Sequence, residues 1–259
     1  MPEFLRILDD GPIRTITLHR PEKRNSLHAG LVYELHEALR SAGSDTQLRA
    51  LVLTGAGEAF CAGADLAYLE DISRNSVAEN HTDSLRLMDM MLALRTHPLP
   101  VIARLNGHAI AGGCGLALAC DIVVAAEAAR LGFPEVRIGF VPAIVGRLLT
   151  ERVGIGRARE LLIRGNLLSA KEAQAWGMVN HVVPPERLDE TVYSIAKEIA
   201  TQTSPQAVSM TRQLLLDIAP RDLGDAMRYG AEFNALSRST ADFAKGIRSF
   251  LEKKPPSWE

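Results

Sequence analysis

The fold is decided by the stretch Asn106 to Cys120, which reads N-G-H-A-I-A-G-G-C-G-L-A-L-A-C. The apolar run Pro100 to Leu105 precedes it, and its apolar end, Leu116 to Cys120, is typical of a short buried helix. We therefore expect a strand, a turn of small residues and a buried helix. Gly112 and Gly113 lack a Cβ, so a ligand atom could approach their backbone closely. The first N–H groups of a helix have no partner inside the helix, which suits the turn to a developing negative charge. Tight packing of helix on sheet explains a glycine pair equally well.

A second segment repeats this plan upstream. The apolar strand expected at Leu48 to Thr54 leads into G-A-G-E-A-F-C-A-G-A-D-L at 55–66, with a helix beginning at about Ala64. Two such turns could direct two backbone N–H groups at one oxygen. Neither turn has the glycine spacing of a dinucleotide site or a P-loop, which disfavours an enzyme that acts on nucleoside triphosphates.

Composition narrows the class of protein further. The 259 residues carry 29 Lys and Arg against 31 Asp and Glu, a formal charge of -2 without a basic stripe, so we expect no nucleic-acid partner. The N-terminal residues lack an apolar signal segment, and the longest apolar run is shorter than the roughly 20 residues that span a bilayer. We expect a cytoplasmic protein that does not enter the membrane. Three cysteines without a C-x-x-C pair predict small buried side chains rather than disulfides or a zinc site.

The remaining pattern predicts a mixed α/β chain. We expect a hairpin over 4–20, a helix from Ser26 or His28 to about Ala42, a mobile loop over 72–80 and a helix from about 82 to 95. After Pro142 the pattern is mainly helical, with one strand at 179–183. The strand-turn-helix plan recurs near 50, 103 and 122, which indicates a spiral of repeated units. We expect an α/β core over 1–195 and a helical C-terminal region over 196–259.

Glu135 is a candidate acid or base. Its neighbours along the chain are apolar: Phe133-Pro134 before it and Val136 after it. Burial disfavours the charged form of a carboxyl and would raise its pKa toward the range of a general acid or base. On the local sequence alone, an exposed loop glutamate is the alternative. We expect Asp65 to orient the turn at Ala64 and Asp121 to close the corner between a helix and a strand.

Five motifs in this order resemble the enoyl-CoA hydratase/isomerase (crotonase) superfamily over essentially the whole chain. They are R-P-E-K-R-N-S-L at 20–27, F-C-A-G-A-D-L at 60–66, N-G-H-A-I-A-G-G-C-G-L-A-L-A-C-D at 106–121, F-P-E-V-R-I-G-F-V-P at 133–142 and F-L-E-K-K-P-P at 250–256. The resemblance implies a ββα spiral core with a helical C-terminal region that serves oligomerisation and closes the CoA site. It also implies a trimer or dimer of trimers and an acyl-CoA thioester substrate.

Carried over to this sequence, the resemblance places the N–H groups of Ala64 and Gly112 on the thioester oxygen and makes Glu135 catalytic. It implies no metal and no cofactor, since coenzyme A is part of the substrate. The CoA site would be lined by Ala62, Ala64, Asp65, Leu66 and Ala67, with Arg24 near its phosphates and with Phe250 and Lys253 approaching from a neighbouring subunit.

Gly115 departs from the two-glutamate pattern, because a two-glutamate hydratase would have Glu at this position. Two carboxylates divide the work of hydration naturally, whereas one suits allylic isomerisation. The chain as a whole looks most like bacterial enoyl-CoA or methylglutaconyl-CoA hydratases, some of which also carry Gly there. Hydration of a 2-enoyl-CoA to a 3-hydroxyacyl-CoA is therefore our leading prediction, and Δ3,Δ2-enoyl-CoA isomerisation is the second. A non-catalytic acyl-CoA or RNA-binding scaffold is the alternative from another class.

Overall fold

The core is a spiral of ββα units, in which each unit gives one strand to each of two sheets. The computed structural model describes residues 2–258. The larger sheet has the strand order β1-β2-β3-β5-β7-β10 and the smaller has the order β4-β6-β8-β9. This arrangement confirms the predicted ββα spiral. Three successive units run β3 (Ala50–Gly55), β4 (Ala59–Cys61), α2 (Leu66–Ile72) and α3 (Val77–Arg95); β5 (Val101–Leu105), β6 (His108–Ile110) and α4 (Gly112–Ala119); and β7 (Ile122–Ala126), β8 (Arg130–Gly132), the 3-10 helix η2 (Pro134–Ile138) and α5 (Ala143–Arg164).

The predicted N-terminal hairpin is present. Its antiparallel strands pair Leu5 with Leu18, and Gly11 takes a positive φ of 56° in the turn. The second strand of the hairpin then runs parallel to β3 and joins it to the sheet. The elements outside the three units are β1 (Leu5–Asp10), β2 (Ile13–Leu18), η1 (Pro21–Lys23), α1 (Ala29–Gly43), β9 (Leu167–Ser169), α6 (Ala170–Trp176), β10 (His181–Val183), η3 (Pro185–Arg187) and α7 (Leu188–Gln202).

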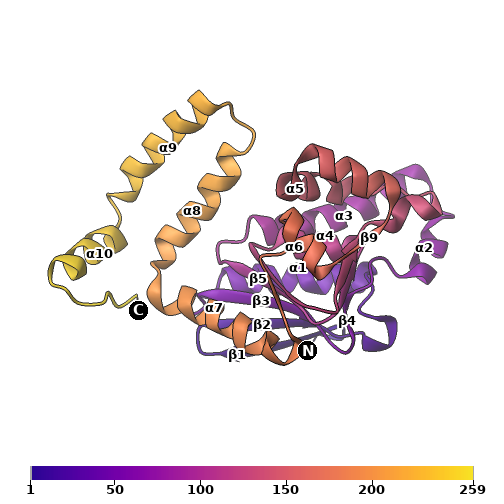
Figure 1. Ribbon diagram of the computed structural model, residues 1–259, viewed down its shortest axis with the longest axis horizontal. Coiled ribbons are helices and arrows are strands. Elements are labelled where there is room, and N and C mark those ends of the chain that lie inside the picture. The colour runs from indigo at the N-terminus through magenta and orange to yellow at the C-terminus, as the bar shows by residue number, and fades with distance from the viewer. Residues whose placement is uncertain (1, 259) are drawn as a thin grey trace.

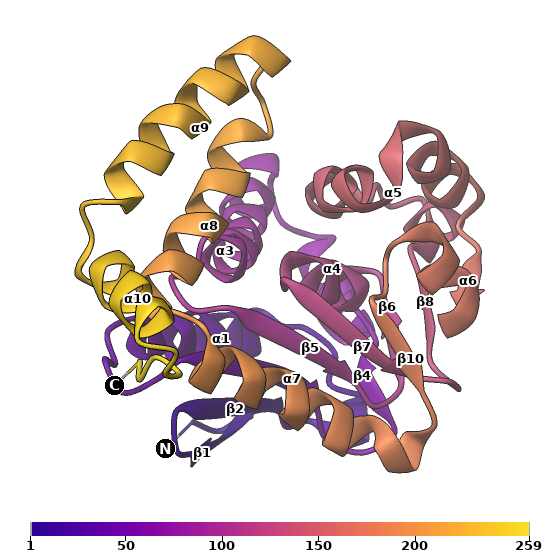
Figure 2. The same ribbon diagram turned by 60° about the vertical axis from the view of Figure 1, so that its left-hand side comes forward.

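Both faces of the six-stranded sheet are covered. On one face, Leu51 and Leu53 of β3 belong to the main core, which also takes in buried side chains of α1, α3 and α4. On the other face, Val52 and Ile102 pack against α7, which lies along the sheet in Figure 2. A parallel strand buried on both faces is apolar throughout rather than alternating. This is why β3 reads as a continuous apolar run.

A helical arm follows the core, as predicted. It comprises α8 (Pro205–Ile218), α9 (Leu223–Ser237) and α10 (Ala241–Leu251), and α9 and α10 stand clear of the two sheets in Figure 1. Ala196 and Ala200 of α7 are buried against the larger sheet. The expected boundary between residues 195 and 196 thus falls inside a helix of the core, and the chain leaves the core after Gln202.

Several element boundaries differ from the prediction. The segments expected to be small-residue turns contain the three-residue strands β4 and β6, which pair with each other. Strands this short have no periodicity of their own, so only the pairing reveals them. Helix α3 begins at Val77 rather than near 82, because Ser76 and Glu79 form a reciprocal capping box. Helix α4 begins at Gly112 rather than at Leu116.

Candidate active site

Three loops meet at one edge of the smaller sheet. Strands β4, β6 and β8 are parallel neighbours, and parallel strands end at the same edge of a sheet. Ala64 follows the end of β4 by three residues, Gly112 follows β6 by two, and Glu135 follows β8 by three. The fold therefore brings together the three residues that the sequence predicts to be catalytic, with the Gly112 loop in the middle.

The N–H group of Ala64 is left free by a short parallel bridge to Leu27. Leu27 donates to the carbonyl of Gly63 over 2.7 Å and accepts from the N–H of Asp65 over 2.8 Å. In a parallel bridge the two flanking residues make the hydrogen bonds, so the N–H of Ala64 itself points away from Leu27. Within residues 2–258 it donates to no backbone group.

Asp65 holds this turn in place, as predicted. Its carboxylate accepts the N–H of Ala67 at 3.1 Å and so caps the N-terminus of α2. The other oxygen pairs with Arg20 at 3.0 Å, and Arg20 also donates to the carbonyl of Ser26 over 2.7 Å. Although the burial of Asp65 opposes its charged form, the bonds from Arg20 and Ala67 prevail and lower its pKa. Arg20 was not among the predicted site residues, and its only signal in the sequence is its place at the start of the first motif.

The second oxyanion candidate, Gly112, follows a strained residue. Ala111 adopts φ 52° and ψ -125°, a region that residues with a Cβ seldom occupy. Its N–H donates to the carbonyl of Gly132 over 2.8 Å. Gly112 is the first residue of α4, and its N–H has no backbone acceptor among the residues described. The conformation of Ala111 thus turns the free N–H end of α4 outward.

The two turns are in direct contact. A Cβ built on Gly63 would lie 2.8 Å from the Cβ of Ala111, and one built on Gly112 would lie 3.0 Å from Leu27 Cδ1. Leu27 therefore touches both turns, since it also pairs with Ala64. This contact joins the two turns that carry the candidate donors at the same sheet edge.

Glu135 is buried rather than exposed. Glu135 is only 8% exposed, and its Oε2 atom has no hydrogen-bond partner in the part of the chain that the structure describes. Burial raises the pKa of this carboxyl above its ordinary value. Burial raises the pKa of the Cys114 thiol in α4, and the Glu135 charge adds to this rise. A carboxyl with these properties suits proton transfer.

The wall beside Gly115 is apolar and closed. A Cβ at this position would lie 2.4 Å from Cγ1 of Val145 and 3.0 Å from Cε of Met91. Both side chains are buried. The space that a second carboxylate would need at Gly115 is thus already filled by α3 and α5. No local pattern identifies Val145, because this contact joins residues 30 positions apart.

The predicted CoA-binding residues fall into two groups. In the first group, Ala62 donates its N–H to the carbonyl of Arg24 over 3.0 Å, which ties the Arg24 loop to the turn that carries Ala64. Leu66 is 74% exposed, and Ala67 and the Arg24 side chain are also exposed. The second group is Phe250, 81% exposed at the end of α10, and Lys253 just after it. Figure 1 shows α10 and α2 at opposite ends of the molecule, so one chain does not bring the two groups together.

Comparison with known proteins shows the family of this chain. The model of the enoyl-CoA hydratase/isomerase family matches residues 10–259. The chain belongs to this family. A Thermus thermophilus protein, named provisionally as an enoyl-CoA hydratase, is 44% identical over 96% of this chain and 98% of its own length. The 1,2-epoxyphenylacetyl-CoA isomerase of Escherichia coli is 33% identical over 100% of this chain and 99% of its own. The crystal structure of an enoyl-CoA hydratase from Mycobacterium smegmatis superimposes with a TM-score of 0.93 at 33% identity, covering 98% of both chains.

The described residues contain neither a candidate metal site nor a candidate membrane-spanning helix. Among residues 2–258, no group of three or more His, Cys, Asp or Glu side chains is placed to hold a metal ion. Within the same residues, no helix has both the length and the apolar character to cross a membrane.

Proposed function

We propose that the chain hydrates a 2-enoyl-CoA thioester to a 3-hydroxyacyl-CoA, with Glu135 as its single acid and base. The buried, unpaired Oε2 of Glu135 is the observation that carries this proposal. The free N–H groups of Ala64 and Gly112 bind the thioester oxygen. Two such donors stabilise charge that forms only during the reaction, and loss of one typically costs about 3 to 4 kcal/mol of barrier.

One carboxylate is sufficient for the proton transfers of a syn addition. The Glu135 carboxylate accepts a proton from water while the water oxygen bonds to Cβ. The electron pair of the Cα–Cβ double bond moves toward the carbonyl, and the two N–H donors hold the resulting enolate oxygen. The neutral carboxyl of Glu135 then returns the same proton to Cα. The sum is one water added across the double bond, and Glu135 ends ionised as it began.

Isomerisation is the second candidate, favoured by the apolar wall at Gly115. Val145 and Met91 offer no strong hydrogen-bonding group to a water molecule there. In this reaction Glu135 removes a Cα proton from a 3-enoyl-CoA and returns it to Cγ, so no water is consumed. The family is described as enoyl-CoA hydratase/isomerase, so both reactions fit it, although the Escherichia coli relative is named for the isomerisation of a different thioester, 1,2-epoxyphenylacetyl-CoA.

The test is incubation of the purified protein with 2-enoyl-CoA and 3-enoyl-CoA, followed by mass spectrometry. A hydratase adds the mass of one water to the 2-enoyl substrate. An isomerase converts the 3-enoyl to the 2-enoyl thioester at unchanged mass, which chromatography resolves. If neither thioester changes while acyl-CoA still binds, both reactions are refuted and the non-catalytic scaffold is favoured.

We also propose that the chain works as a trimer or dimer of trimers in the cytoplasm and needs no cofactor besides the CoA of its substrate. Large apolar side chains exposed on the arm support an oligomer: Leu223, Met227, Leu236, Phe243, Ile247, Phe250 and Leu251. Light scattering should give three or six times the chain mass of 28.2 kDa. A monomer at micromolar concentration would contradict the oligomer, and loss of activity on dialysis against a chelator would contradict the cofactor-free reaction.

A further inference from the structure

Helix α4 has few directional contacts of its own. Its sequence is G-G-C-G-L-A-L-A, and every residue from Gly113 to Ala119 is buried. No side chain caps its N-terminus. Close contacts of Gly113 with Cys61 and of Gly115 with Val145 fix how near the helix lies to its neighbours. The hydrogen bonds at its two ends add the directional constraints on its position along its own axis.

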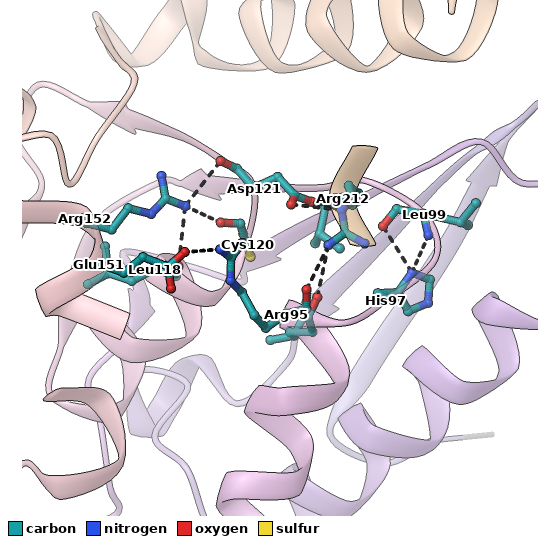
Figure 3. Close-up of polar contacts among 11 residues, drawn as sticks. Arg95, His97, Leu99, Leu118, Cys120, Asp121, Glu151, Arg152 and Arg212 are labelled. Carbon is teal, nitrogen blue, oxygen red and sulfur yellow. Dashed lines mark hydrogen bonds and ion pairs between the residues drawn. The ribbon is translucent and has the colours of Figure 1, made fainter. Parts of the chain in front are cut away.

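At the C-terminal end of α4, Arg152 binds carbonyl groups of the helix and of the residues just after it. Arg152 of α5 donates from Nη2 to the carbonyls of Leu118 at 3.4 Å and Asp121 at 3.2 Å, and also to that of Cys120. Figure 3 shows the three bonds converging on the guanidinium. The last carbonyls of a helix have no partner inside the helix and carry its partial negative charge, so a cation there is favourable.

A second arginine fixes the chain just beyond this end. Arg212 of α8 donates from Nε to both carboxylate oxygens of Asp121 at 2.9 Å, and Asp121 also accepts the N–H of Val101 at 2.7 Å. Arg212 reaches the C-terminal carbonyls of α3, at Leu94 and Arg95, over 3.4 Å each and is only 9% exposed. The corner after α4 is therefore anchored to a rigid junction, although Arg212 contacts no carbonyl of α4 itself.

We infer that Arg152 is a positioning residue for the oxyanion donor at Gly112, acting through α4 from its opposite end. The inference rests on the proposed role of the Gly112 N–H. Eight residues make a helix of about 12 Å that moves as a unit, so a displacement of its C-terminal end by about 1 Å along the axis moves the donor by about the same amount. A misplacement of about 1 Å can cost about 100-fold in rate. Arg152 holds the C-terminal end of α4 against this displacement through its bonds to the carbonyls of Leu118, Cys120 and Asp121.

The test compares Arg152→Met and Arg152→Lys with Arg159→Met, an exposed position on the same helix. The first readout is kcat and KM on the 2-enoyl or 3-enoyl substrate. The second is the absorption of bound 2,4-hexadienoyl-CoA, whose conjugated carbonyl absorbs at longer wavelength when its oxygen is strongly hydrogen-bonded. Circular dichroism and thermal melting show that each variant is folded.

Arg152→Met should lower kcat at least tenfold, leave KM within about threefold and weaken the red shift of the bound thioester. Arg152→Lys keeps the charge but replaces the planar guanidinium by an ammonium on a stem of different length, so its loss should be intermediate. Arg159→Met should match the wild type. If Arg152→Met does not fold, the kcat and the red shift of Arg152→Lys test the inference instead.

Wild-type kcat and red shift in the folded Arg152 variants would overturn the inference. So would a rise in KM with both other readouts unchanged. Failure of the proposed function looks different, because the wild-type protein itself would then turn over neither thioester. If the wild type shows the red shift but no turnover, the red shift measured in the Arg152 variants tests the inference by itself. No red shift in the wild type would remove both the oxyanion hole and the role of Arg152.

Discussion

Glu135→Gln should change activity and stability in opposite directions. The amide cannot accept and return a proton, so we expect kcat to fall by about 10² to 10⁴, the usual contribution of a general acid–base group. That range equals about 2.7 to 5.5 kcal/mol of barrier. Binding of acyl-CoA should be little changed, because the amide has nearly the same shape and the oxyanion donors are untouched.

The stability change follows from burial without a partner. The carboxyl is 8% exposed and its Oε2 is unpaired, and burial raises its pKa from the ordinary 4.5. As pH rises above 4.5, the unfolded chain loses its proton first while folded Glu135 keeps it, so the wild-type protein loses stability until pH passes the raised pKa. The Gln variant has no such loss. We expect it to gain about 1 kcal/mol near pH 8, which raises Tm by about 2 to 4 °C.

Melting temperatures of both proteins from pH 4 to 8, together with the enoyl-CoA assay, test this reasoning. The Tm difference should be small near pH 4 and grow with pH. Glu198→Gln, the same change at an exposed position of α7, should alter neither activity nor the pH dependence. A Tm difference that does not vary with pH would refute the buried charge, and full activity in Glu135→Gln would remove the residue from the mechanism.

Three further predictions concern the surroundings of Glu135. Ala111→Gly should relieve the strain at φ 52° and leave the fold as stable or about 1 kcal/mol more stable; thermal melting checks this, and a fall of several degrees would contradict it. Gly115→Glu alone should destabilise the protein by at least about 1 to 3 kcal/mol through overpacking against Val145. In a denaturant titration, the double variant Gly115→Glu/Val145→Ala should recover part of that loss. Equal stability of the single and double variants would contradict the overpacking. Asp65→Asn should weaken the bond from Arg20 and reduce kcat more than acyl-CoA affinity; a pure loss of affinity would assign Asp65 to binding instead.

Much of the fold was predictable because it depends on local periodicity. The hairpin at the N-terminus, the helix α1 capped by His28 and the apolar strands β3, β5 and β7 appear where the pattern places them. The three-residue strands β4 and β6 were not predictable, since they exist only as partners of each other. Helix α5 has a kink at Gly154, where φ is 75°, so it consists of two helical segments joined by this glycine.

The candidate groups of the site were visible in the sequence, but their environment was not. The motifs name Ala64, Gly112 and Glu135, and the glycine at 115 already shows that a second carboxylate is missing. The local sequence cannot say that Glu135 is buried, because an isolated glutamate in a loop is usually solvated. Its burial arises in the tertiary structure, where η2, which carries Glu135, contacts α5.

The sequence by itself thus determined the longer elements of this protein, the family resemblance and the candidate reacting groups. Only the tertiary structure decided how those groups behave. It closed the wall at Gly115 with Val145 and Met91, freed two N–H groups at one sheet edge, and brought Arg212 to Asp121 from 91 residues away. The physical reason is that secondary structure follows from neighbours along the chain, whereas burial, pKa and donor alignment depend on contacts between residues far apart in it.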